Sequence, residues 1–138
     1  METANVTPQP ETTTPETVQL SVPAHPAYLG LVRTATAGVG ARLDLTIDEI
    51  EDLRLAADEA GSLVLAHAVE GSNLDVRFTL AAERLTIGFS ARTTSTTPPD
   101  EQSFGWTVLA ALAGEVRADL SDGRLLIELG HVRAARSA

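Results

Sequence analysis

The sequence has 138 residues and contains neither cysteine nor lysine, and aromatic residues make up only 4% of it. The absence of cysteine excludes disulfide bonds, thiolate nucleophiles and cysteine-ligated metals. The hydrophobic content of 43% is enough for a packed core, which must be built mostly from aliphatic side chains. No apolar run approaches the roughly 20 residues that span a bilayer, and no basic stretch precedes an apolar one near the N-terminus. These absences favour a cytoplasmic protein with no membrane partner.

The charge balance is strongly acidic. The sequence contains nineteen aspartates and glutamates but only ten basic residues, all of them arginine, so the formal net charge is −9. This excess argues against nucleic acid as a partner, because phosphate contacts require basic patches. It favours electrostatic steering toward a basic protein partner. The histidines, His25, His67 and His131, do not have the spacing of metal ligands, so we expect no metal site.

The two ends of the chain differ in composition from its middle. Residues 1–16 are rich in threonine and proline and contain almost nothing apolar. Such a segment cannot bury enough surface to offset its ordering entropy, so we expect a disordered tail there. The folded domain is predicted to span residues 17–132, and residues 133–138 are predicted to be a short flexible C-terminus.

The first half of the domain predicts a strand followed by two helices. Val18, Leu20 and Val22 alternate with polar residues, which indicates a half-buried strand. The apolar residues of the first helix, which should end near residue 43, are Tyr28, Leu31, Val32, Ala35 and Val39. Thr46 and Glu49 have the spacing of a capping box at the start of the second helix. Its apolar stripe consists of Ile47, Ile50, Leu53, Ala57, Ala60 and Val64, and Gly71 is the predicted C-cap.

The second half predicts two hairpins separated by a helix. The expected elements are strands Leu74–Leu80 and Arg84–Ala91, a polar loop Thr93–Gln102, a helix Phe104–Ala113, and strands Val116–Leu120 and Arg124–Leu129. Asp122-Gly123 is a typical two-residue turn between the last two strands. The order βααββαββ predicts an α+β fold, in which helices cover one face of a mostly antiparallel sheet.

Several motifs of the sequence resemble one family in order and spacing. Thr46-Ile47-Asp48-Glu49-Ile50, followed by Asp58-Glu59-Ala60, resembles the second helix of bacterial anti-sigma factors and serine-protein kinases of the RsbW and SpoIIAB type. Gly105-Trp106-Thr107-Val108-Leu109 is similar to the second glycine box of that family, and Gly123 lies where its last hairpin carries a glycine. Two stretches resemble actinobacterial members of the family: Leu-Arg-Leu-Ala-x-Asp-Glu at Leu53–Glu59, and Ser-Phe-x-Trp at Ser103–Trp106. The resemblance covers about residues 18–129 and implies the GHKL (Bergerat-type) two-layer sandwich.

The resemblance also implies a site for ATP and Mg²⁺, with a helix glutamate as general base and an asparagine four residues later as metal ligand. Glu59 matches the glutamate, but Leu63 stands at the asparagine position and offers no oxygen to Mg²⁺. The chain has no Asp-x-Gly turn to read adenine, and the phosphate-binding glycines are reduced to Gly105. Phosphoryl transfer depends on positioning and charge neutralisation. We therefore expect little or no kinase activity, with Glu59 a vestigial base and Gly105 and Gly123 the candidate nucleotide-binding residues.

The function implied by the resemblance is that of an anti-sigma factor. Such a protein sequesters a sigma subunit of RNA polymerase, is released by an anti-anti-sigma protein with a STAS domain, and acts as a homodimer. Arg33 lies at the distance from Leu43-Asp44 where the family carries a partner-binding arginine. Two alternatives stay open. The chain can be an active ATP-dependent serine kinase of the anti-anti-sigma protein, or a module for a signalling partner unrelated to sigma.

The same residues also have plain structural interpretations. Asp58 and Glu59 can form a solvated helix face, and Arg33 can make a surface ion pair of little energetic weight. We expect Phe104 and Trp106 to pack in the core or in a groove, not under a nucleotide.

Overall fold

The computed structural model describes residues 14–132, so most of the predicted tail and the predicted C-terminal segment lie outside the described residues. Within this range the chain forms five strands and three α-helices in the predicted order. Their bounds are β1 Glu16–Pro23, α1 Leu29–Arg42, α2 Ile47–Leu65, β2 Asn73–Leu80, β3 Arg84–Arg92, α3 Phe104–Leu112, β4 Glu115–Ser121 and β5 Arg124–Val132, with a short 3-10 turn at Pro26–Tyr28. The α+β fold predicted from the sequence is confirmed.

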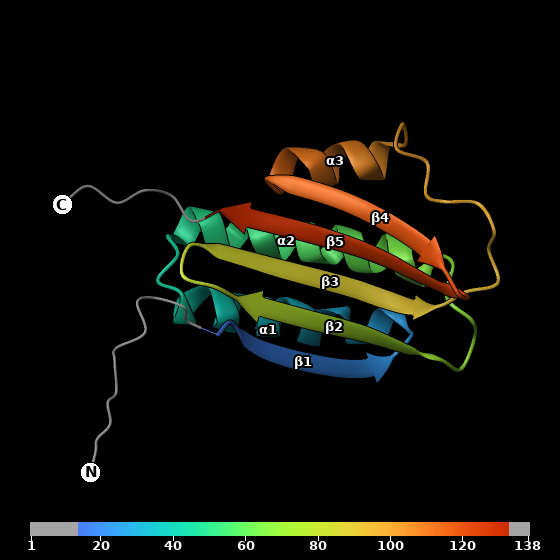
Figure 1. Cartoon of the computed structure of the whole chain (residues 1–138), viewed down its shortest axis with the longest axis horizontal. Coiled ribbons are helices and arrows are strands. Elements are labelled where there is room, and N and C mark those ends of the chain that lie inside the picture. The colour runs from blue at the N-terminus through green and yellow to red at the C-terminus, as the bar shows by residue number, and fades with distance from the viewer. Residues whose placement is uncertain (1–13, 133–138) are drawn as a thin grey trace, which may run out of the picture.

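The strands form one antiparallel sheet in the order β1-β2-β3-β5-β4, so β1 and β4 are its edges. The helices form a second layer on one face of this sheet, and no element of residues 14–132 covers the other face, which we call the open face (Figure 1). Alternate residues of each central strand point toward the helices, which is why Phe78, Ile87 and Ile127 are fully buried. Apart from Phe78, Phe89 and Trp106, the buried core is aliphatic, as the composition predicts.

Helices α1 and α2 approach each other closely because glycines line their contact. A Cβ atom at Gly61 of α2 would lie 2.7 Å from Cδ2 of Leu29, and one at Gly40 of α1 would lie 3.0 Å from Cγ1 of Ile50. Distances this short leave no room for larger residues without movement. The close approach brings the exposed side of α1 within side-chain reach of α2.

The start of α2 is as predicted, but its end is not. The hydroxyl of Thr46 accepts a bond from the Glu49 N–H, and the Glu49 carboxylate accepts one from the Thr46 N–H at 2.8 Å. The helix stops at Leu65, and Gly71 lies in the later turn into β2 with a φ of +82°. The prediction that Gly71 is the C-cap is therefore wrong. The N–H of Val69 bonds to the end of β3 instead, which draws this segment away from the helix.

Three residues predicted for the helix stripes are exposed. The exposed fractions of Tyr28, Leu31 and Ile47 are 41%, 50% and 79%. Tyr28 precedes α1, Leu31 lies on the side of α1 away from the sheet, and Ile47 is the first residue of α2. Thr36 is buried in the first stripe instead, where its hydroxyl donates to the Val32 carbonyl at 2.8 Å. A local bond satisfies this threonine, so a polar residue occupies a core position.

Candidate functional site

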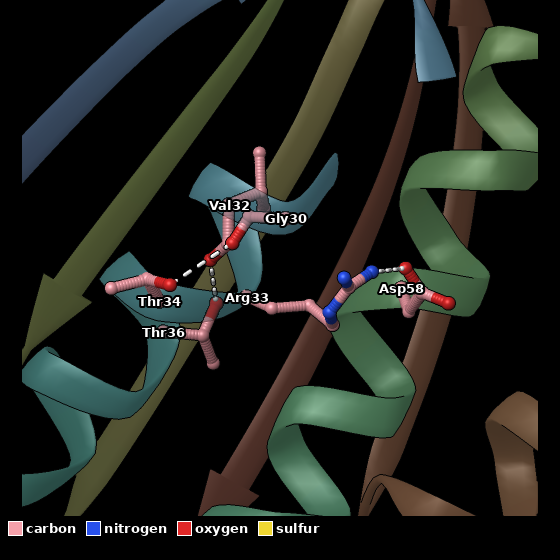
Figure 2. A network of polar contacts seen from close by, with 6 residues as sticks. All are labelled: Gly30, Val32, Arg33, Thr34, Thr36 and Asp58. Atoms are coloured by element: carbon pink, nitrogen blue, oxygen red, sulfur yellow. Dashed lines mark hydrogen bonds and ion pairs between the residues drawn. The ribbon is translucent and has the colours of Figure 1, made fainter. Parts of the chain in front are cut away.

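An ion pair joins the exposed sides of α1 and α2. Nη1 of Arg33 donates to Oδ1 of Asp58 at 2.6 Å, and the two side chains are 39% and 41% exposed. Figure 2 shows the guanidinium reaching from α1 to the carboxylate on α2. A pair as exposed as this one contributes at most about 1 kcal/mol to stability. Its groups are therefore accessible to another molecule and are not essential for the fold.

The backbone beside Arg33 sets how its guanidinium lies. A Cβ atom at Gly30 would be 3.5 Å from Nη2 of Arg33, so this side of the guanidinium lies over the first turn of α1. Thr34 donates to the Gly30 carbonyl at 3.1 Å (Figure 2). The predicted position of Arg33 beside the buried stripe agrees with the structure. Its use as a partner contact stays a prediction.

Glu59 follows Asp58 on α2, so its side chain points about 100° around the helix from this ion pair, and it faces α3. A Cβ atom at Gly105, in the first turn of α3, would lie 2.5 Å from Oε2 of Glu59 and 3.3 Å from Cδ2 of Leu63. Only a residue without a side chain fits there without movement. The structure thus brings together two of the predicted site residues, Glu59 and Gly105.

The start of α3 turns its two aromatic residues in different directions. The hydroxyl of Ser103 caps the helix by accepting the Trp106 N–H at 3.2 Å. Trp106 is 8% exposed and packs in the core, as expected, but Phe104 is 83% exposed. The prediction that Phe104 packs in the core or a groove is therefore wrong. As the first residue of α3, Phe104 points outward, whereas Trp106 points inward.

Gly123 lies in a different place, at the tip of the β4–β5 hairpin. Asp122 and Gly123 both have positive φ, 52° and 73°, as the predicted turn requires. The Gly123 carbonyl accepts the Thr93 N–H at 2.9 Å, which ties the hairpin to the end of β3. A cavity of about 360 Å³ opens here, and neither Glu59 nor Gly105 lines it. The candidate nucleotide-binding residues therefore do not form one continuous site.

The residues around Glu59 do not fit Mg²⁺. Mg²⁺ requires oxygen ligands, and Leu63 presents hydrocarbon one turn beyond Glu59. Gly105 lies close to the carboxylate of Glu59 as well. Among residues 14–132, no group of three or more histidine, aspartate or glutamate side chains is placed to hold a metal ion.

Two further polar contacts could not have been inferred from the sequence. Nε2 of His131 on β5 lies 3.0 Å from Oε2 of Glu49 on α2, and both side chains are mostly buried. Arg84 on β3 donates to Glu115 on β4 above the backbone of Gly130. This bond lowers the pKa of the Glu115 carboxyl below its ordinary value of 4.5 and raises the pKa of Arg84. Both contacts join segments far apart along the chain, so no local signal reveals them.

An antiparallel sheet with three helices on one face defines a two-layer α+β sandwich. The model of the histidine kinase-like ATPase domain matches residues 22–130. The chain therefore belongs to the histidine kinase-like ATPase domain family. Within residues 14–132, no helix is long and apolar enough to cross a membrane.

Several curated relatives of this chain carry the name RsbW, which confirms the resemblance seen in the sequence. The serine-protein kinase RsbW of Halalkalibacterium halodurans is 39% identical over 74 residues, which are 53% of this chain and 46% of that protein. The anti-sigma-F factor RsbW of Mycobacterium tuberculosis (strain H37Rv) is 33% identical over 107 residues, 78% of this chain and 63% of that protein. The chain thus spans about half to three fifths of the relatives it matches.

A solved structure supports the fold independently of these sequences. The RsbU and RsbW domains of a Mycobacterium tuberculosis protein match this chain with a TM-score of 0.69 at 18% identity. The match covers 89% of this chain and 34% of that one. At this level of identity the likeness concerns the fold alone.

Proposed function

We propose that this chain is a cytoplasmic anti-sigma factor. It binds a sigma subunit of RNA polymerase and releases it when an anti-anti-sigma protein with a STAS domain competes for the same surface. The relatives named RsbW support this proposal, because one of them is named as an anti-sigma-F factor. The observation that carries it is the accessible guanidinium of Arg33 between two helices.

Arg33, Asp58 and Leu55 together form what we call the seam surface. Leu55 lies three residues before Asp58 on α2, where side chains of a helix are neighbours, and it is 54% exposed. Protein interfaces combine arginine and apolar anchors at their centre with polar groups around them. The seam surface has this composition, which supports its role as the partner contact.

We propose that binding, not phosphoryl transfer, is the activity of this chain. A general base contributes about 10²–10⁴-fold to a reaction, but only on a substrate that is already bound and oriented. Glu59 faces Leu63 and Gly105 instead of a metal-binding set. It is therefore a vestigial base, and Gly105 serves to pack α3 on α2.

An active serine kinase is the alternative that a specific observation favours. Glu59 is retained, and the relatives from Bacillus subtilis and Halalkalibacterium halodurans are named serine-protein kinases. Under this alternative the anti-anti-sigma protein is the phosphate acceptor. A third possibility, a binding module for another signalling protein, predicts that no sigma factor binds at all.

We also propose that the chain forms a homodimer through the open face of the sheet. The net charge of −9 opposes association, but this face carries charges of both signs in pairs. Arg117 bonds to Glu128 at 2.7 Å and Arg124 to Asp75 at 2.9 Å. A hollow of about 580 Å³ on this face is lined in part by Asp75, Thr86 and Glu128. Light scattering should give the mass of a dimer for the wild type and of a monomer for Thr86→Arg; a monomeric wild type would refute the dimer.

The main proposal is tested by binding purified components. The immobilised full-length chain is exposed in turn to each purified sigma factor of the same organism, and then to a purified STAS-domain protein from that organism. We expect one sigma factor to be retained and to be displaced by the STAS-domain protein. Failure to retain any sigma factor would contradict the proposal and favour the third possibility.

A further inference from the structure

In the structure the guanidinium of Arg33 binds a carboxylate, and this carboxylate belongs to Asp58 of the same chain. We infer that Asp58 is an internal competitor: a partner reaches Arg33 with an aspartate or glutamate side chain that must displace Asp58. This inference rests on the proposed function, because it takes Arg33 as a partner contact. It adds the chemistry of the partner and a built-in control of the binding surface.

The geometry favours displacement over simultaneous binding. Asp58 engages Nη1, and Nη2 lies over the backbone at Gly30. A carboxylate binds a guanidinium most strongly through two parallel N–H groups. A partner that uses the Nη1–Nη2 edge finds one of these nitrogens already engaged. Two carboxylates on one guanidinium would also lie close enough to repel each other.

The exposure of the pair makes the exchange feasible. Both side chains are about two-fifths exposed, and ion pairs in that environment are weak. An arginine–carboxylate pair enclosed by a protein partner is screened less by water and by salt, so its Coulomb attraction is stronger. A partner that encloses Arg33 can therefore take it from Asp58, whereas a small solvated anion gains little by doing so. Asp58 thus makes the surface selective for a partner that fits it.

The inference is tested by removing the competitor. Calorimetry measures the affinity of three full-length variants, Asp58→Asn, Asp58→Ala and Asp52→Asn. The ligand is the sigma factor that the immobilised chain retains. Asp52 is an exposed residue of the same helix, so Asp52→Asn makes the same change of charge. We expect the Asp58 variants to bind roughly two- to fivefold more tightly and Asp52→Asn to match the wild type. Unchanged or weaker binding by both Asp58 variants would overturn the inference.

A double variant separates competition from general repulsion. In an Arg33→Ala background, Asp58→Ala should no longer tighten binding, because there is no guanidinium left to release. If it still does, Asp58 acts only through its charge and the inference is wrong. If Arg33→Ala alone leaves the affinity unchanged, the proposed partner surface fails. If Arg33→Ala weakens binding but the Asp58 variants do not tighten it, only the competition fails.

A partner-free measurement tests the competition independently of sigma. Glutarate, a small dicarboxylate, is titrated into the ¹⁵N-arginine-labelled chain, and the Nε resonance of Arg33 is followed by NMR. We expect this resonance in Asp58→Ala to shift at a lower glutarate concentration than in the wild type. Superimposable titration curves would show that Asp58 does not restrict access to Arg33, which would overturn the inference even if a sigma factor binds.

Discussion

Gly105 of α3 lies directly against the carboxylate of Glu59 on α2. A Cβ atom at Gly105 would be 2.5 Å from Oε2 of Glu59, so the space that a side chain would need is taken by this carboxylate. The contact brings together two residues that the resemblance connects with nucleotide chemistry, and we propose that they serve packing instead. The role of Glu59 and the role of Gly105 can each be tested on the purified chain without a sigma factor.

Gly105→Ala is expected to gain less stability than a Gly→Ala change at an open helix position, because the new methyl group forces the flexible Glu59 side chain to move. The new methyl group must displace Glu59 and the side chain of Leu63, which would be 3.3 Å away. The matched control is Gly38→Ala on α1, where a Cβ meets nothing within 4 Å. That change should stabilise the fold by about 0.5–1 kcal/mol. Urea unfolding of both variants measures the difference, and equal stability would contradict the close contact.

The purified chain is expected to show no measurable transfer of ³²P from ATP to a STAS-domain substrate. Leu63, which lies beside Gly105 one turn beyond Glu59, supplies no oxygen ligand. Calorimetry with ATP and Mg²⁺ should likewise detect no binding. The control is Glu59→Gln, which should behave as the wild type in both assays. Phosphorylation that is lost in Glu59→Gln would support the kinase alternative.

The Arg84–Glu115 contact predicts how stability changes in acid. The pKa of Glu115 is lowered in the folded state by the bond from Arg84, so the unfolded state binds a proton more readily. The pair therefore contributes stability above about pH 4.5, and this contribution is lost as the pH falls through the folded-state pKa. The melting temperature of the wild type should exceed that of Glu115→Gln at pH 7. This difference should shrink below pH 4.5; a difference that stays constant down to pH 3 would refute the assignment.

Leu55→Ser is expected to weaken sigma binding by about 1 kcal/mol or more, roughly fivefold or more in affinity. Leu55 is exposed, so the change should alter stability by less than about 0.5 kcal/mol. Ile47→Ser is the control, because Ile47 is the first residue of the same helix and is 79% exposed. Calorimetry should show an affinity close to the wild type for Ile47→Ser. Equal losses in the two variants would mean that the seam surface is not the binding site.

The parts of the fold that depend on local signals could be predicted from the sequence. The Thr46–Glu49 capping box and the Asp122-Gly123 turn are examples, because each is defined by residues next to one another. The end of α2 could not be predicted, since the bond between Val69 and Arg92 depends on where β3 ends in space. The outward direction of Phe104 could not be predicted for a similar reason: its apolar character does not reveal which way the first residue of α3 points.

The candidate site was only partly predictable. The positions of Arg33, Glu59 and Gly105 follow from motif spacing, and the structure shows that Glu59 meets Gly105. The pairing of Arg33 with Asp58 joins two helices, and the many arginines and acidic residues of the sequence offer no means of choosing this pair. Tertiary packing, through the glycines between α1 and α2, determines that choice.

The affinity of Arg33→Ala for the retained sigma factor tests the central claim most directly. The full-length variant is compared with Arg42→Ala as a control. Arg42 is an exposed arginine on the same helix, and its Nη2 lies 3.4 Å from Oε2 of Glu16. Arg33→Ala should lower stability by no more than about 1 kcal/mol but weaken binding by about 2 kcal/mol or more, roughly thirtyfold. Arg33→Lys should restore only part of the loss, because an ammonium cannot replace the planar fork. A folded Arg33→Ala that binds sigma and the STAS-domain protein as tightly as Arg42→Ala would contradict the account.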